Sequence, residues 1–197
     1  MKIKIFLYPL LGLLLSCSGT SRVSSKRSLN DFSQWRTGHD PLTVQLVPAT
    51  GDDLLLREKN KTVVHVRFRV KQYGEVSFPL NSKTPEGAEA LKTDLSESKA
   101  IHITYRANQE FILQLRQTGV HGGVHPHVLI PASKESTTVT IPFTEFKGGK
   151  TPLDLTDVAK FNFAFLSNNT EEGYAELKIS SFTIDRSNNR KELTIRD

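Results

Sequence analysis

The sequence predicts an all-β fold, a β-sandwich of the jelly-roll type, in which two sheets pack face to face. Most segments after residue 60 carry a hydrophobic residue at every second position, as expected of strands that bury one face. Turns that contain glycine or asparagine separate these segments. Only two short stretches, 85–92 and 152–159, are candidates for helices. Many short strands with frequent turns and almost no helix are typical of a sandwich.

The alternating segments lie, in chain order, at 62–70, 101–107, 110–117, 137–143, 160–167 and 174–184. The residues that the alternation directs into the core are Thr62, Val64, Val66, Phe68 and Val70 in the first segment, Ile101, Ile103 and Tyr105 in the second, Phe111, Leu113 and Leu115 in the third, and Phe161, Phe163 and Phe165 in the fifth. Trp35 is also expected in this core, and Leu95 is expected to plug the sandwich before a strand. Where the chain leaves a sheet at Pro142, Phe143 and Phe146 should fold back as plugs. A core of this size makes 28–197 a single domain.

The first 27 residues predict export and lipid anchoring. A basic start precedes an apolar run at 5–15, which is too short to span a bilayer and has the layout of a secretory signal. Residues 14–17, LLSC, resemble the bacterial lipobox, which implies removal of residues 1–16 and acylation of Cys17, with palmitate among the acyl groups. Residues 17–27 then form a flexible, serine-rich tether. Because serine follows the cysteine, we expect a cell-envelope protein anchored in the outer membrane.

The positive charge of the chain lies outside the predicted domain. The whole sequence carries 26 Lys and Arg against 21 Asp and Glu, a formal net charge of +5. Five basic residues and no acidic ones precede Ser28, so 26 − 5 leaves 21 basic against 21 acidic residues from Ser28 onward. A nucleic-acid-binding domain concentrates basic residues on its fold, so this distribution argues against nucleic acid as a partner.

Several segments follow one another as they do in galactose-binding-like jelly rolls: 29–37, 91–107, 110–117, 136–146, 152–165 and 175–184. Over about residues 29–186 the chain resembles family-eleven carbohydrate-binding modules and the complex I intermediate-associated protein domain. The resemblance implies a galactose-binding-like sandwich whose ligands, where present, lie on the concave face of one sheet. The strands at 110–117 and 125–131 would form part of that face. The candidate contacts are Gln114, Arg116, His125 and His127, joined by His102 and Arg106.

The resemblance also bears on bound ions. Related modules often carry a structural calcium where an early aspartate meets acidic residues of the last strand. This chain offers Asp31, but Ser180 and Ser181 stand where such modules often place aspartates. We therefore expect no cofactor.

Three histidines, His121, His125 and His127, fall within seven positions. If the segment is a strand, His125 and His127 point to one side with Cα atoms about 6.6 Å apart, a geometry that can chelate a metal. Jelly-roll cupins combine such a pair with a later glutamate, but Pro131 and Ala132 occupy its place. A surface that contacts a sugar or peptide and a solvated hairpin are the other interpretations of the cluster.

The function that these patterns favour is a non-catalytic, carbohydrate-binding-like module on a bacterial lipoprotein. No nucleophile elbow, phosphate-binding loop or His-Glu-x-x-His motif is present in the sequence. Few aromatic residues are available as exposed platforms, which weighs against sugar binding. The main alternative is an interaction or assembly module that binds another envelope protein, and a metal-dependent jelly-roll enzyme is a weaker one.

Overall fold

The structure is a computed structural model of the whole chain, and it describes residues 26–28, 34–49, 54–58, 60–81, 89–120 and 122–186. The described strands are β1 (Lys26–Ser28), β2 (Arg36–His39), β3 (Val44–Val47), β4 (Leu55–Glu58), β5 (Lys61–Arg69), β6 (Gly74–Pro79), β7 (Ser98–Ala107), β8 (Phe111–Gln117), β9 (His127–Ile130), β10 (Ser133–Pro142), β11 (Val158–Phe165) and β12 (Ala175–Arg186). A 3-10 helix, η2 (Phe143–Glu145), follows β10.

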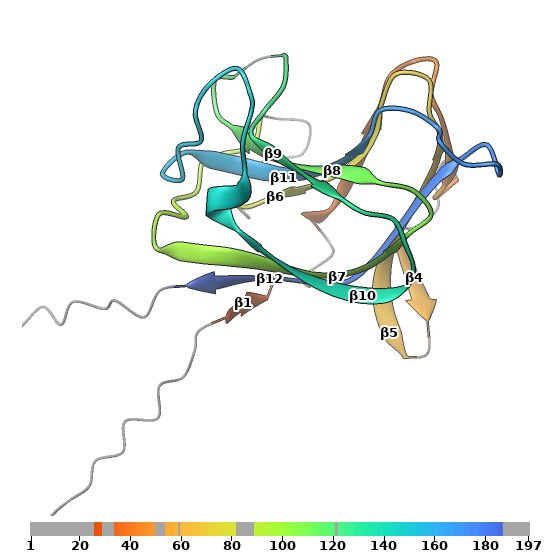
Figure 1. Cartoon of the computed structure of the whole chain (residues 1–197), viewed down its shortest axis with the longest axis horizontal. Coiled ribbons are helices and arrows are strands. Elements are labelled where there is room, and N and C mark those ends of the chain that lie inside the picture. The colour runs from red at the N-terminus through yellow and green to blue at the C-terminus, as the bar shows by residue number, and fades with distance from the viewer. Residues whose placement is uncertain are drawn as a thin grey trace, which may run out of the picture.

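Two antiparallel sheets form a sandwich (Figure 1). Sheet A has the order β10-β7-β12-β5-β3, with β1 added beside β12 and β4 beside β5. Sheet B has the order β2-β6-β11-β8-β9. From β5 onward the chain mostly crosses from one sheet to the other between consecutive strands, so each sheet is built from distant parts of the sequence. The predicted all-β sandwich is confirmed.

The N-terminal edge of the fold begins earlier than we expected. Lys26 and Arg27, which we placed in the flexible tether, belong to β1 and pair with Asp185 and Ile184 of β12. Among the described residues, strand pairing therefore includes the two residues before Ser28.

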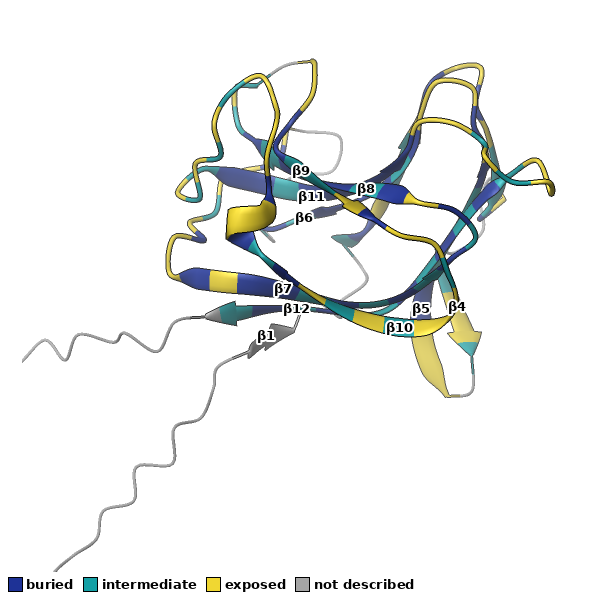
Figure 2. Cartoon of the chain, in the orientation of Figure 1, coloured by how far each residue is buried: buried dark blue, intermediate teal, exposed yellow. Residues whose placement is uncertain are grey.

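Aromatic rings from both sheets meet in the core. Phe182 of β12 lies with its ring centroid 5.0 Å from that of Phe161 and 5.4 Å from that of Phe163, both on β11 of the other sheet. The ring of Trp35 lies 5.3 Å from that of Phe163 and 6.1 Å from that of Phe182. Edge-to-face rings at these separations contribute about 0.5–1.5 kcal/mol beyond the area that they bury. The inner faces of the two sheets are accordingly the buried ones (Figure 2).

The residues that the strand alternation directs inward are buried, with one exception. Trp35, Leu95, Phe143 and Phe146 are buried, and so are all the predicted inward residues from Val64 onward. Thr62 is exposed instead, because β12 pairs with β5 only from Val64 onward. Residues 61–63 pair with β4 alone, in the hairpin at the lower right of Figure 1, and of these three only Val63 is buried.

The helix expected at 152–159 does not form. Asp154 instead closes a tight turn, in which its carboxylate accepts hydrogen bonds from the backbone N–H and the hydroxyl of Thr156 at 2.9 and 2.7 Å. Such side-chain bonds to the nearby backbone compete with a helix. Strand β11 then begins at Val158. Of the other candidate, 85–92, the structure describes only residues 89–92, which are not helical. No helix in the described ranges is long and apolar enough to cross a membrane.

Candidate functional site

Five hydrogen-bonding side chains form a transverse row on the outer face of sheet B, the face that points away from sheet A. The strand register places Arg36 of β2 beside Ser77 of β6, Ser77 beside Asn162 of β11, and Asn162 beside Gln114 of β8. Gln114 in turn lies beside His127 of β9. We call Arg36, Ser77, Asn162, Gln114 and His127 the polar row. With strands about 4.8 Å apart, the row runs about 19 Å across the sheet.

A second row, two residues further along each strand, is basic. Lys160 of β11 lies directly beside Arg116 of β8. The backbone N–H of Leu115 donates to the carbonyl oxygen of Pro126 at 2.9 Å, so the pairing of β8 with β9 continues to the residues just before β9. This register brings His125 beside Arg116. We call Lys160, Arg116 and His125 the basic row.

One carboxylate, that of Glu75 on β6, reaches Lys160 of the basic row from the other side of the polar row, where Glu75 pairs with Ala164. Its Oε1 lies 3.9 Å from the Lys160 ammonium, and its Oε2 accepts a hydrogen bond of 3.0 Å from the amide of Asn162. Burial raises the pKa of Glu75, against the opposing charges of Lys160 and Arg116. Burial likewise lowers the pKa of Lys160, although Glu75 opposes it. Both charged groups therefore lie in a partly desolvated place. Their attraction across 3.9 Å does not offset the free energy lost when each is removed from water.

Two buried polar atoms on this face lack a hydrogen-bond partner among the described residues. They are the Oδ1 of Asn162, in a residue 1% exposed, and the Nδ1 of His125, in a residue 4% exposed. Burial, and then the charges of Arg116 and Lys160, lower the pKa of His125, so its ring is neutral at neutral pH. Leaving a buried polar atom unpaired costs about 1–3 kcal/mol. A ligand that forms a hydrogen bond with either atom would regain this free energy.

The other cluster histidine, His127, is held by its surroundings. Its Nδ1 donates to the carbonyl oxygen of His125 at 2.9 Å, which makes Nε2 the acceptor in the neutral ring. Gly149, with φ +104°, lies against the same segment, and a Cβ there would stand 2.7 Å from the nitrogen of Pro126. Gly149 therefore lets a neighbouring loop pack against the histidine segment.

No group of three His, Cys, Asp or Glu side chains in the described ranges is placed to hold a metal ion. His121 and Asp31 lie outside those ranges, as does Cys17, so their expected roles stay predictions. Ser180 and Ser181 lie on β12, beside a shift in its pairing with β7.

The structure brings together four of the six predicted contacts and separates the other two. Gln114, Arg116, His125 and His127 share the outer face of sheet B. His102 and Arg106 lie on β7, in sheet A, and do not join them. The cause is the chain crossing from one sheet to the other between β7 and β8.

On sheet A, His102 and Arg106 have local partners. His102 bonds to Thr140 at 2.8 Å through Nδ1 and to Asp185 at 2.5 Å through Nε2. Arg106 forms an ion pair with Glu58, whose other oxygen receives Lys178 at 2.6 Å. These contacts give both residues a structural role that needs no ligand.

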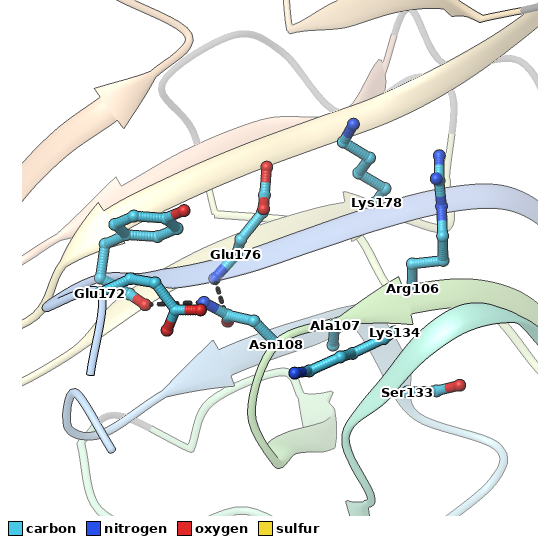
Figure 3. A pocket seen from close by; sticks show the side chains of 9 residues that line it. Arg106, Ala107, Asn108, Ser133, Lys134, Glu172, Glu176 and Lys178 are labelled. Carbon is cyan, nitrogen blue, oxygen red and sulfur yellow. Dashed lines mark hydrogen bonds between the residues drawn. The ribbon is translucent and has the colours of Figure 1, made fainter. Parts of the chain in front are cut away.

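A pocket of about 280 Å³ opens on sheet A between β7, β10 and β12 (Figure 3). The amide of Asn108, at its centre, is already used: it donates to the carbonyl oxygen of Tyr174 at 2.9 Å and accepts from the backbone N–H of Glu176 at 2.8 Å. Glu176 also receives His65 at 2.6 Å and Arg67 at 2.9 Å. Several of the polar residues that line the pocket, Arg106, Asn108, Glu176 and Lys178, thus already have partners within the protein.

Reasoning from the sequence missed Glu75, Lys160 and Asn162. Each alternates with inward residues on its strand, which marks it as outward-facing. The order of strands in sheet B, which places β11 between β6 and β8, was needed to bring them beside Gln114 and Arg116.

Comparison with solved structures finds the same architecture. A family 11 carbohydrate-binding module from Clostridium thermocellum, solved in complex with a β-1,3-1,4-mixed-linked tetrasaccharide, superposes with a TM-score of 0.61 at 17% identity, over 82% of this chain and 96% of that one. The chain has the fold of such a module. The family 11 module of a cellulosomal cellulase from the same organism gives a TM-score of 0.59 at 16% identity, over 82% and 95% of the two chains. No protein-family model and no curated protein matches the sequence.

Proposed function

We propose that this protein is a non-catalytic carbohydrate-binding module that binds a saccharide on the outer face of sheet B. The observation that carries the proposal is the buried, unpartnered Oδ1 of Asn162 at the centre of the polar row. A sugar hydroxyl can donate to that oxygen and accept from neighbouring groups at once, as a hydroxyl is both donor and acceptor. Because Asn162 is 1% exposed, its longer neighbours must move as the sugar arrives.

The length of the polar row supports an oligosaccharide as ligand. The row spans five strands, so a glycan laid across them would contact several strands at once. Beside the row, Ala164, Ile112 and Leu129 form an apolar strip in register with Glu75, against which the carbon face of a sugar ring can pack. The fold adds support, since the family 11 module named above was solved in complex with a β-1,3-1,4-mixed-linked tetrasaccharide.

We further propose that the module is held in the bacterial cell envelope through acyl groups on Cys17. The lipobox-like sequence supports this proposal. From Cys17 to Lys26 there are 26 − 17 = 9 residues, which reach at most about 30 Å when fully extended, so the module would stay near the membrane. Replacing Cys17 by serine should move the protein from the membrane fraction to the soluble fraction. Unchanged fractionation of that variant would contradict the anchor.

The binding proposal is tested by isothermal titration of the purified protein with oligosaccharides of a mixed-linkage β-glucan, a xylan, a galacturonan and a sulfated galactan. We expect at least one glycan to bind, and Gln114→Ala to weaken it about fivefold or more, as expected for one lost hydrogen bond of about 1 kcal/mol. Thr183→Ala, on the outer face of sheet A, is the matched control and should bind normally. If no glycan binds, or if both variants behave alike, the proposal is wrong.

A further inference from the structure

The outer face of sheet B carries an excess of positive charge within a neutral domain. Leaving out the histidines and Arg36, which has contacts of its own, the two rows and Glu75 contain Arg116 and Lys160 against one carboxylate, so the formal charge is 2 − 1 = +1. From Ser28 onward the whole chain balances 21 basic with 21 acidic residues. The excess is therefore local to this face.

Two of these cations face each other across neighbouring strands. Arg116 and Lys160 are direct register partners, an arrangement that destabilises an antiparallel pair. No described residue lies within ion-pair or hydrogen-bond distance of the Arg116 guanidinium, and the ammonium of Lys160 has only the 3.9 Å contact with Glu75. The side chain of Lys160 is 24% exposed, so water compensates it incompletely. Threonine and valine are enriched in strands and lysine is depleted, so strand propensity does not explain the pair.

We propose that the saccharide bound by this face is acidic, and that the basic row holds its carboxylate or sulfate group. An anion between Arg116 and Lys160 would relieve their repulsion, and the guanidinium can grip two of its oxygens in a bidentate manner. His125 stands beside Arg116 with an unpartnered Nδ1 that can donate a further bond to the anion. The inference rests on the proposed function, because the polar row must still bind the sugar rings.

The composition of the face favours an acidic over a neutral glycan. Neither row contains Phe, Tyr or Trp, the side chains whose large flat faces make the greatest apolar contact. Trp35 and Tyr105 are buried in the core. Charge-assisted hydrogen bonds are roughly twice as strong as neutral ones. An acidic sugar could therefore gain from them the binding free energy that aromatic stacking does not supply on this face.

Paired ligands test the inference. The purified protein is titrated with oligogalacturonate, with the same oligomer after reduction of its carboxyl groups, and with an oligosaccharide of a sulfated galactan before and after desulfation. We expect one acidic ligand to bind at least tenfold more tightly than its neutral counterpart, and its identity distinguishes a carboxylate from a sulfate. Raising the salt concentration should weaken that binding.

Variants then place the anion. Arg116→Ala should weaken the acidic ligand about 10- to 100-fold, and Arg116→Lys should recover part of the affinity, because the charge returns without the fork. Arg69→Ala removes the same charge from an exposed position on β5 of sheet A and should change binding by less than twofold. Circular dichroism checks that each variant is folded.

The outcomes separate the two proposals. Equal binding of the acidic and reduced ligands, with Arg116→Ala unchanged, overturns the acidic specificity and leaves the saccharide-binding face standing. Equal losses in Arg116→Ala and Arg69→Ala show attraction to overall charge only and also overturn it. No binding of any acidic or neutral glycan overturns both.

Discussion

The outer faces of the two sheets use similar residues in opposite ways. On sheet A, Glu176 joins His65 and Arg67, and Glu58 joins Arg106 and Lys178, so each carboxylate has two hydrogen-bonding partners. On sheet B, one carboxylate stands 3.9 Å from Lys160, and Arg116 has no described partner within ion-pair distance. A solvated sheet face normally pairs its charges across strands, as sheet A does. This difference underlies our proposal that a ligand completes the outer face of sheet B.

The pKa values show the same contrast. The hydrogen bond from His65, followed by that from Arg67, lowers the pKa of Glu176 to about 2. On sheet B, burial raises the pKa of Glu75 and lowers that of Lys160. The native surroundings therefore favour the charged form of the sheet A carboxylate and disfavour the charged forms on sheet B.

The largest expected effect comes from a core substitution that weakens the packing of sheet A on sheet B. Phe182→Ala removes the ring that joins β12 of sheet A to Phe161 and Phe163 of sheet B. We expect the free energy of unfolding to fall by about 3–5 kcal/mol, as for other large core deletions. Chemical denaturation measures it, and Phe182→Leu, which retains much of the volume, should lose less. If Phe182→Ala unfolds at the wild-type denaturant concentration, the ring does not tie the sheets together.

A smaller loss should follow from breaking a finished contact on sheet A. Glu176→Gln removes the charge that His65 and Arg67 share, and should lower the free energy of unfolding by about 1–2 kcal/mol at pH 7, after allowing for partial exposure. Glycan binding should not change. If Glu176→Gln loses more binding free energy for the glycan than free energy of unfolding, the two sheet faces do not differ as we propose.

The same contact predicts a pH dependence of stability. Because the folded pKa of Glu176 is about 2 against an ordinary 4.5, its contribution is complete above pH 4.5 and disappears as the pH falls toward 2. The difference in unfolding free energy between the wild type and Glu176→Gln should shrink over that range. A difference that stays constant from pH 7 to pH 2.5 would show that the ion pairs do not stabilise the fold.

Sheet B should respond to substitution in the opposite sense. Lys160→Met keeps most of the side-chain volume and removes one of two adjacent like charges, so the free energy of unfolding should stay unchanged or rise by up to about 1 kcal/mol. Binding of the acidic glycan should nevertheless weaken markedly. Lys178→Met on sheet A is the matched control, and it should lose stability because it leaves Glu58 short of a partner. Equal stability losses in the two variants would contradict the comparison.

The fold and part of the site could be predicted from the sequence because both depend on local alternation. The period-two pattern placed Phe161, Phe163 and Tyr105 inward, and it placed Gln114 and Arg116 on the opposite side of their strand. The helix predicted at 152–159 is wrong, because Thr156 donates two hydrogen bonds to the carboxylate of Asp154 and these bonds hold the backbone in a turn.

Which strands become neighbours could not be predicted from alternation. His102 and Arg106 show the same outward pattern as Arg116, yet β7 and β8 lie in different sheets. Lys160 and Asn162 are more than forty positions beyond Arg116 and meet it only through the pairing of β11 with β8. Contacts of this kind depend on long-range topology, so a single sequence indicates the outward residues but not which of them share a face.

The smallest expected effect is a pH dependence of binding on sheet B. His125 is faced by Arg116 from β8, Lys160 from β11, Glu75 from β6 and His127 from β9, and its pKa is lowered by burial and by the two cations. A bound anion favours protonation of His125 and also of Glu75, so the complex holds more protons than the free protein, and affinity should rise as the pH falls. Full uptake of one proton on binding would raise the affinity tenfold per pH unit, and we expect the gain from pH 7.5 to 6.5 to be smaller, about threefold or less. Titrations of the wild type, His125→Gln and Glu75→Gln over this range separate the two groups. A wild-type affinity that falls on acidification would place the anion away from the basic row, because no group there gains affinity by losing a proton.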